Sequence, residues 1–489
     1  VIFYMVEKLT RRLKFNDMFF AGIAYMIGAG VYTLMPFIIK YGKGNSWLAF
    51  VIGGIVSIFT GLSFARLNYE YPVNDAEYSW ILNIFKNKKN NKSNKFVKYF
   101  ATTTIWIVGI MGIFARATTV LGLAEFISTY NLGIPKYLIT LVGLGIPTLI
   151  NMIGVNYLSN IIKSITAVVI ASFVFIIGYA GKNGKFSNNN NLGVDTNNFP
   201  NLIRASFITI FAFTGFQSVV QLSEEAKSKD VIPKSITTSV IFITFFYSIL
   251  LISVISILGL KKAGATVYPV SEVYNKIFGS NGRNIVTILS IICMFSAIIT
   301  GILGDSRLFQ KLSVKGIAPK YLSKLVSLDK LFKKKEPFEN GENSENSENG
   351  ENGENGENGE NGENGENGET SENSENYKLE NTNNNALFDK MPIAAIVSVF
   401  ILSYGLTFVK GGIFELMANA TNSMIFFIFS VVNLLVIVNY FKYRKSPNKP
   451  KSSDKIIDKF LNIFPIYAIL GFILSIVFLI ISPKFYKLN

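Results

Sequence analysis

The sequence predicts an all-α polytopic membrane protein, and three observations support this. Only 16% of the 489 residues are charged, against about 25% in soluble domains, while 49% are hydrophobic. The hydrophobic residues gather into runs of about 20, the length that a helix needs to cross about 30 Å of hydrocarbon. Glycines near the middle of two runs predict that two of these helices are discontinuous.

Eleven such runs follow one another along the chain, and each is long enough for one membrane-spanning helix. They cover approximately residues 18–39, 46–66, 97–124, 137–153, 157–180, 202–222, 234–259, 284–306, 391–409, 414–440 and 463–482. We therefore expect about 11 transmembrane helices.

The basic residues indicate how the chain lies in the membrane. The formal net charge is +15, and Lys and Arg cluster in segment 1–17 and in the connections 86–98 and 442–459. Alternate connections, near Lys40 and Lys136, carry isolated charges. Cytoplasmic loops carry the excess of Lys and Arg, so we expect segment 1–17 to be cytoplasmic and the C-terminus to lie outside. This distribution favours a lipid bilayer over nucleic acid as the partner, and the plasma membrane is the default location.

The composition also argues against an enzyme. The chain has no histidine and a single cysteine, Cys293, so it lacks a histidine base, a histidine metal ligand and an internal disulfide. It shows no phosphate-binding loop. We expect no catalytic residues, no metal and no cofactor.

A long acidic insert separates the eighth and ninth runs. Residues 336–390 contain a Glu-Asn-Gly/Ser triplet repeat from Glu339 to Asn376, with no apolar residues to bury. Such a composition predicts a disordered cytoplasmic linker, although a docking or regulatory role is the alternative.

The interruptions in the first and sixth runs suggest a binding site. The first run contains Ile27-Gly28-Ala29-Gly30-Val31, and the sixth contains a glycine and a hydroxyl at Thr214-Gly215. Breaks at corresponding positions of two halves are typical of inverted-repeat transporters that bind at the midplane. An unwound first helix would offer N–H groups to a carboxylate, and an unwound sixth would offer carbonyls to an ammonium group. The alternative is that the glycines only allow close helix packing.

Five motifs in order resemble the amino acid, polyamine and organocation (APC) transporter superfamily, over approximately residues 16–444. The motifs are IGAGVY in the first run, FARLNYEYPVNDAEYSW after the second, NMIGV at 151–155, FAFTGFQSVVQLSEEAKSKDVIP from the sixth, and GDSR followed by KGIAP after the eighth.

The resemblance implies a core of ten helices in two inverted repeats. Residues 18–180 would form the first repeat, and 202–335 with 391–440 the second. Residues 441–489 would add a basic cytoplasmic loop and a peripheral eleventh helix. The resemblance also implies a substrate site at the two breaks, with Phe213 as an aromatic gate. The candidate substrate-binding residues are Ile27, Gly28, Ala29, Gly30, Ala212, Phe213, Thr214, Gly215 and Phe216.

The sequence departs from the family pattern in three places. Residues 228–230 are Ser-Lys-Asp where the family has Asn-Pro after the paired glutamates. Residues 74–77 are Asn-Asp-Ala-Glu where the family has paired glycines before Tyr78. Val169 stands where many members carry a lysine that replaces a sodium ion, and Lys163 lies closer to the inner end, where it would extend to the interface. The coupling ion, a proton or sodium, stays open; Ser296 and Thr300 are candidates for a sodium site.

Arg116 is a charge within the third run and should have a partner, because an unpaired arginine at mid-membrane costs about 2.5 to 3.5 kcal/mol on insertion scales. We favour a pairing with Glu125, Asp305 or helix carbonyls over a cavity-facing role that would attract an anionic side chain. Residues 128–136 contain no cysteine, so we expect no disulfide-linked partner subunit.

These features together predict a secondary active permease that carries amino acids by alternating access. A polyamine or organic cation carrier ranks second, since no carboxylate is evident at mid-depth in the first, third or sixth run. A non-transporting amino-acid sensor of the same fold is the alternative that would use the acidic insert.

Overall fold

The computed structural model describes residues 9–27, 29–86, 93–128, 130–186, 198–266, 268–326, 390–409, 413–443 and 463–485. The chain divides into two units, one formed by residues 1–327 with 389–489 and the other by 328–388. The second unit lies outside the described residues, and so does the acidic repeat with its predicted disorder.

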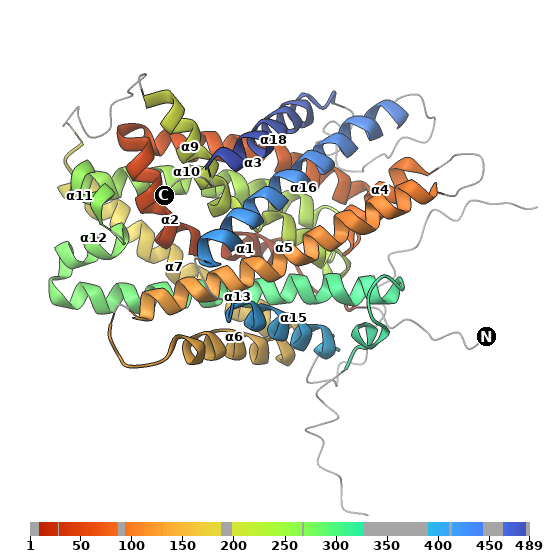
Figure 1. The fold of residues 1–489 in the computed structure, drawn as a ribbon, viewed down its shortest axis with the longest axis horizontal. Coiled ribbons are helices and arrows are strands. Elements are labelled where there is room, and N and C mark those ends of the chain that lie inside the picture. Colours follow the sequence, from red (N-terminus) through yellow and green to blue (C-terminus); the bar gives the residue numbers. More distant parts are fainter. Residues whose placement is uncertain are drawn as a thin grey trace, which may run out of the picture. The chain divides into compact units, whose positions relative to one another are not determined.

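The described part of the chain is helical, with no strands beyond two isolated bridges, Leu13 with Ala226 and Val326 with Met391 (Figure 1). The helices are α1 (Phe15–Met26), α2 (Ala29–Gly42), α3 (Ser46–Glu70), α4 (Ala76–Phe85), α5 (Lys95–Ser128), α6 (Lys136–Ile153), α7 (Val155–Asn183), α9 (Phe199–Phe213), α10 (Val231–Leu258), α11 (Leu260–Ala265), α12 (Pro269–Phe278), α13 (Ser280–Val314), α15 (Ile393–Leu406), α16 (Ile413–Tyr443) and α18 (Ile466–Phe485). Three 3₁₀ helices join them: η1 (Lys43–Asn45), η3 (Phe216–Glu225) and η4 (Lys320–Ser323).

Every predicted apolar run coincides with a helix or a broken helix of the described residues, which confirms the all-α polytopic class. Eight helical stretches there are long and apolar enough to cross a membrane, and α15 and α18 are shorter apolar helices. The inverted repeat and the count of about 11 spans stay predictions.

The broken helices lie in the interior. α1 packs against α7, α10 and α13, while η3 contacts α1, α10 and α13. Of the 18 most apolar consecutive residues in the stretch Phe199–Glu225, 83% are buried. In the stretch Tyr157–Asn183 of α7, only 28% of the corresponding 18 residues are buried. α7 therefore presents much of its apolar surface outward, as a helix next to lipid does.

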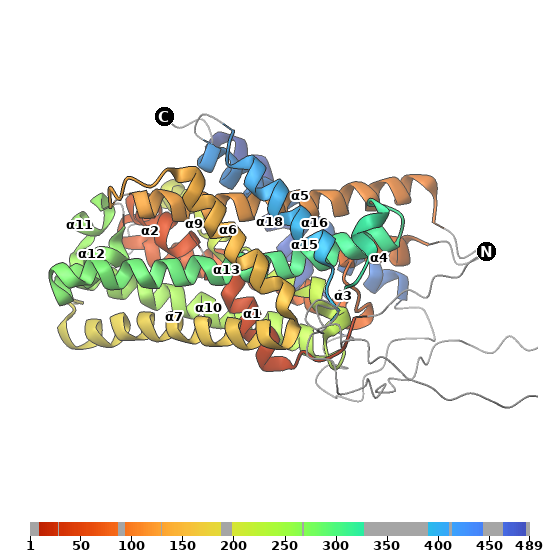
Figure 2. The ribbon, with the colours of Figure 1, turned by 90° about the horizontal axis from the view of Figure 1, so that it is seen from below.

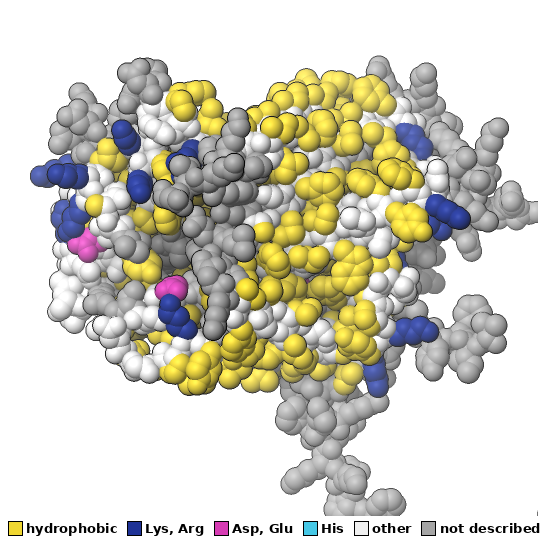
Figure 3. Space-filling model, viewed as in Figure 1, with side chains coloured by type: hydrophobic (Ala, Val, Ile, Leu, Met, Phe, Trp, Pro, Cys, Tyr) yellow, Lys and Arg dark blue, Asp and Glu magenta, His cyan; other side chains and the backbone are white. Residues whose placement is uncertain are grey.

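The surface agrees with this arrangement. On the face seen in Figure 3, hydrophobic side chains cover a broad central band, and Lys and Arg lie toward its two ends. α13 runs along this direction, with α12 near one end and α4 near the other (Figure 2). Charged ends around an apolar band are typical of a chain that crosses a bilayer.

Candidate site at two helix breaks

The first break lies where the sequence predicts it. α1 ends at Met26 and α2 begins at Ala29; Ile27 between them leaves the helix with φ −81° and ψ 69°. Gly28 lies outside the described residues, and Ala29 and Gly30 form the start of α2. The first N–H groups of α2 have no partner within their own helix, so this end offers hydrogen-bond donors and a positive dipole.

The second break separates α9 from η3. α9 ends at Phe213. Gly215 has a backbone φ of +126°, a value that residues other than glycine rarely adopt. The N–H of Gly215 donates to Gln217 Oε1 at 2.9 Å. The chain then continues for ten residues as the 3₁₀ helix η3. Runs of this helix beyond three or four residues are uncommon and often mark a hinge.

The two breaks touch each other, although four predicted spans lie between them along the chain. A Cβ atom at Gly215 would lie 2.5 Å from Tyr25 Cβ and 3.0 Å from the Tyr25 carbonyl carbon. Gly215 is therefore needed both for its conformation and for close contact with the last turn of α1.

Two side chains already occupy the carbonyls at the end of α1. The hydroxyl of Tyr247 in α10 donates to Met26 O, and the thiol of Cys293 in α13 donates to Ile27 O, each at 2.9 Å. The Cys293 side chain is buried. Neither contact can be predicted from the sequence, because nothing local to Tyr247 or Cys293 indicates a partner more than 200 residues away.

The candidate residues around the second break are buried. Ala212, Phe213 and Phe216 have no exposed surface, and Thr214 is partly buried. The Phe213 ring contacts those of Phe50 and Tyr247, at centroid distances of 6.4 and 6.0 Å. Phe213 thus belongs to an aromatic cluster beside the break, and its role as a gate stays a prediction.

Ser296 and Thr300, the candidates for a sodium site, lie in α13 with their hydroxyls engaged. Thr300 Oγ1 donates to Ser296 O at 2.7 Å, and Ser296 Oγ lies 3.4 Å from Thr166 Oγ1. Within the described residues, no group of three or more acidic, histidine or cysteine side chains could hold a metal ion.

Arg116 lies against Asp305, one of the partners considered from the sequence. Arg116 Nη1 is 3.5 Å from Asp305 Oδ2, and both side chains are buried. The guanidinium group also lies over the Tyr25 ring, 5.9 Å from its centroid. The pair is therefore adjacent to the last turn of α1.

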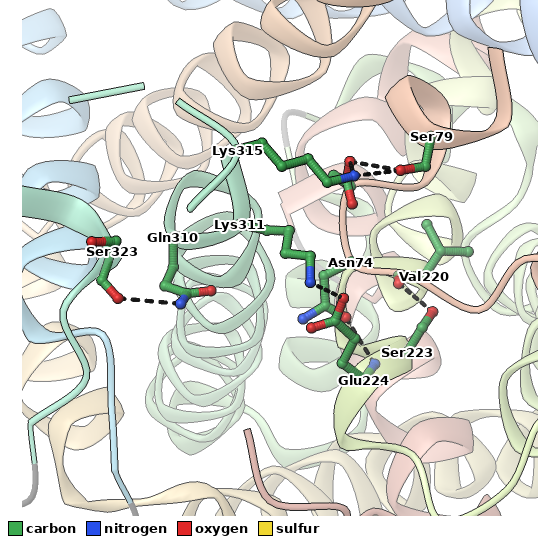
Figure 4. Close-up of polar contacts among 10 residues, drawn as sticks. Asn74, Ser79, Val220, Ser223, Glu224, Gln310, Lys311, Lys315 and Ser323 are labelled. Carbon is green, nitrogen blue, oxygen red and sulfur yellow. Dashed lines mark hydrogen bonds and ion pairs between the residues drawn. The ribbon is translucent and has the colours of Figure 1, made fainter. Parts of the chain in front are cut away.

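A set of ion pairs, which we call the latch, joins η3 and the start of α4 to the C-terminal end of α13. It comprises Asp75, Glu224, Glu225, Arg307, Lys311 and Lys315. Arg307 holds Glu225 through two hydrogen bonds, of 3.1 and 3.3 Å. Figure 4 shows Lys311 reaching Glu224 and Lys315 pointing toward Ser79. Lys311 Nζ lies 2.6 Å from Glu224 Oε1, and Lys315 also pairs with the carboxylate of Asp75.

Backbone groups extend the latch to the N-terminal segment. The Glu225 carbonyl accepts the N–H groups of Arg12 and Leu13, each at 2.9 Å, and the Glu224 N–H donates to Asn74 Oδ1 at 2.9 Å. Nearby, Lys163 pairs with Asp17 at 2.7 Å. Residues 74 and 75, which depart from the family pattern, thus connect the start of α4 to η3 and to the end of α13.

Glu77 lies beside the latch in α4, outside the predicted spans, with 1% of its surface exposed. Burial raises the pKa of this carboxyl to about 7, its own backbone hydrogen bond opposes the shift, and the nearby Asp75 adds to it.

α13 carries these contacts in sequence order. Cys293 reaches the first break, Asp305 meets Arg116, Arg307 and Lys311 hold η3, and Lys315 holds the start of α4. One rigid helix therefore connects the breaks to the latch.

Comparison with known proteins gives a consistent result. A family model described as amino acid permease matches residues 13–487. The inner membrane transport protein YbaT of Escherichia coli K12 is 24% identical over 313 residues, which cover 62% of this chain and 69% of YbaT. The branched-chain amino acid permease BcaP of Bacillus subtilis is 23% identical over 336 residues, covering 65% and 70%. The amino-acid permease RocC of the same species is 24% identical over 343 residues, covering 65% and 69%.

Proposed function

Because this chain belongs to the amino acid permease family, we propose that it is a secondary transporter that carries amino acids by alternating access, with the substrate bound between the two helix breaks. Membership supports a multi-pass membrane transporter and points to transport rather than enzymatic catalysis. The substrate site, the mechanism, the cytoplasmic N-terminus and the plasma-membrane location belong to the proposal.

The contact between the breaks carries the proposal. Gly215 touches the last turn of α1, so the N-terminus of α2 and the C-terminus of α9 lie in one region. An α-amino acid has both a carboxylate and an ammonium group. The N–H groups around Gly28, Ala29 and Gly30 suit the carboxylate, and the carbonyls near Ala212 and Phe213 suit the ammonium.

The contacts of the first break also favour a substrate whose carboxylate faces the start of α2. Tyr247 and Cys293 already donate to the Met26 and Ile27 carbonyls. The groups of this break that remain for a ligand are therefore mainly the N–H donors at the start of α2, which bind an anion.

The charges nearby favour an amino acid over a polyamine. A polyamine carrier needs carboxylates that can face its cationic groups. Asp305, the acidic side chain next to the first break, lies against Arg116, so its charge is balanced.

Uptake into proteoliposomes tests the proposal. Acidic, neutral and basic radiolabelled amino acids and one polyamine would be supplied, with pH and sodium gradients imposed separately. We expect saturable uptake of one amino-acid class, driven by one gradient or by internal exchange. Uptake of the polyamine alone, or of nothing, would contradict the proposal.

A pair of glycine variants locates the site. Gly215→Ala places a Cβ 2.5 Å from Tyr25 Cβ at a residue with positive φ, whereas a Cβ at Gly178 in α7 meets nothing within 4 Å. We expect Gly215→Ala to abolish uptake and Gly178→Ala to keep it, with both proteins inserted at normal levels. Equal uptake by the two variants would exclude the breaks as the site.

Deleting the acidic repeat would distinguish a carrier from a non-transporting sensor. Deletion of residues 339–376 should leave the uptake of a carrier intact. A protein that binds an amino acid, shown by protection against thermal unfolding, yet transports nothing with or without the repeat would be a sensor.

A further inference from the structure

The Arg116–Asp305 pair is incomplete for a buried pair of charges. The side chains are 10% and 2% exposed, but the closest approach, between Nη1 and Oδ2, is 3.5 Å. Among the described residues, Arg116 Nε, Arg116 Nη1 and Asp305 Oδ2 have no hydrogen-bond partner. Buried charges are retained at low cost only when their remaining atoms are hydrogen-bonded, so a pair this loose is poorly explained as a structural element.

Two glycines make room for the pair, and a third lies beside the Tyr25 hydroxyl and Gln221. A Cβ at Gly301 would overlap Arg116 Nη1, and one at Gly112 would overlap Asp305 Oδ1. At Gly304 it would lie 2.5 Å from Gln221 Oε1, another buried acceptor without a partner among the described residues. α5 and α13 thus have glycine at three positions where any larger side chain would overlap these polar groups.

Few other ionisable groups surround Asp305. Arg116 faces it from α5 and Tyr25 from α1, while η3 contributes the neutral Gln221 and α15 carries no charged residue. Arg307, two residues along α13, is engaged by Glu225 of η3. Charged residues on the helices that pack against α13 are otherwise paired elsewhere or lie at helix ends. The pairs are Asp17 with Lys163, Glu125 with Lys136, Glu224 with Lys311, Glu272 with Lys262, and Lys276 with the Ile257 carbonyl. Those at helix ends are Lys40, Lys95, Lys98, Lys182 and Lys320.

The pair lies between the breaks and the latch. Arg116 contacts the ring of Tyr25, whose backbone touches Gly215, and Asp305 is two residues from Arg307 of the latch. A change of charge at Asp305 can therefore influence both regions.

We propose that Asp305, held by Arg116, binds and releases the coupling proton of the transport cycle. This inference rests on the proposed transport function. Asp305 takes one proton from water on the side to which the site is open and becomes a neutral acid, while Arg116 keeps its charge. The carboxyl then carries an O–H donor in place of a negative charge, and the attraction to Arg116 falls. Release of the same proton on the other side restores the pair, so one proton and one positive charge cross with each cycle.

Two measurements on the full chain in proteoliposomes test this assignment. Counterflow, the exchange of labelled for unlabelled substrate, needs no net proton movement. Accumulation driven by an imposed pH gradient does, and an internal pH dye records the proton itself. The wild type should show counterflow, substrate-dependent acidification inside, and accumulation that grows as the external pH falls.

Asp305→Asn removes the proton site and keeps the shape. We expect it to lower pH-driven accumulation and the dye signal at least tenfold, and counterflow much less. This substitution alone would leave Arg116 without its counter-ion. The double variant Arg116→Gln/Asp305→Asn removes both buried charges, and it should also lose pH-driven accumulation and the dye signal while keeping most of its counterflow. Gly178→Ala is the control that should match the wild type in every assay.

The outcomes separate the two proposals. Absence of counterflow in the wild type would overturn the transport function itself. Wild-type counterflow without substrate-dependent acidification, or with accumulation driven only by sodium, would overturn the proton assignment alone. So would pH-driven accumulation of wild-type size in either Asp305→Asn protein.

Discussion

The two ends of the described helix bundle are held together by different kinds of ion pair. At the latch, Arg307 and Glu225 are 0% and 2% exposed and bound through two hydrogen bonds. At the opposite end, Lys136 pairs with Glu125 while both side chains are more than half exposed. Buried, hydrogen-bonded pairs are costly to break, whereas exposed pairs contribute about 0 to 1 kcal/mol. One end is thus joined by a buried, hydrogen-bonded ion pair and the other by an exposed ion pair.

Breaking the most buried ion pair, Arg307–Glu225, should cause the largest loss in the free energy of unfolding. Removing one partner leaves an uncompensated buried charge, so we expect Arg307→Met to lower the free energy of unfolding by about 3 to 5 kcal/mol. Thermal unfolding in detergent measures the loss. The double variant Arg307→Met/Glu225→Gln should recover much of it, and a double variant as unstable as the single would show that the charge is not the cause.

A pH titration sharpens the description of the latch end. Burial raises the pKa of Glu77 from 4.5 to about 7. The fold thus favours the protonated acid, and this contribution to stability is complete below about pH 4.5 and is lost as the pH rises through about 7. Glu77→Gln should match the wild type near pH 5 and exceed its stability above pH 8, by about 3 kcal/mol at most. Parallel stability curves for the two proteins between pH 5 and 8 would contradict this.

The half-exposed part of the latch should give an intermediate result. The side chains of Lys311 and Glu224 are each 23% exposed, and Lys311 Nζ lies 2.6 Å from Glu224 Oε1. We expect Lys311→Met to cost about 1 kcal/mol, and the cost to shrink as salt is added, because partly exposed pairs are screened. A salt-independent loss as large as that of Arg307→Met would mean that the latch acts as a single buried network.

The smallest effect is expected at the opposite end. Lys136→Met removes a pair whose side chains are 55% and 56% exposed. The change in unfolding free energy should stay within about 0.5 kcal/mol, and uptake should be unaffected. A loss comparable to that at Arg307 would remove the distinction between the two ends.

Much of the fold follows from the sequence because it depends on local signals. Apolar runs predict the long helices, and glycines 28, 30 and 215 predict the breaks, since glycine weakens a helix. The short helices α4 and α12 were missed, because ten residues carry too little periodicity to stand out.

The contacts of the site follow from the sequence much less well. Asp75 and Lys315 are 240 residues apart, and nothing near either residue indicates that the start of α4 meets the end of α13. The same holds for Cys293 at the Ile27 carbonyl. Arg116 was the exception, because a charge within an apolar run requires a partner, and that requirement narrows the choice to a few residues.

The ten residues of η3 also fix a distance. A 3₁₀ helix rises about 2.0 Å per residue and an α-helix about 1.5 Å, so these residues span about 20 Å as they are and would span about 15 Å if rewound. Rewinding would draw Glu224 and Glu225 about 5 Å toward Gly215. One segment that changes pitch could thus convert a local change at the breaks into a displacement of the latch by nearly a full helical turn.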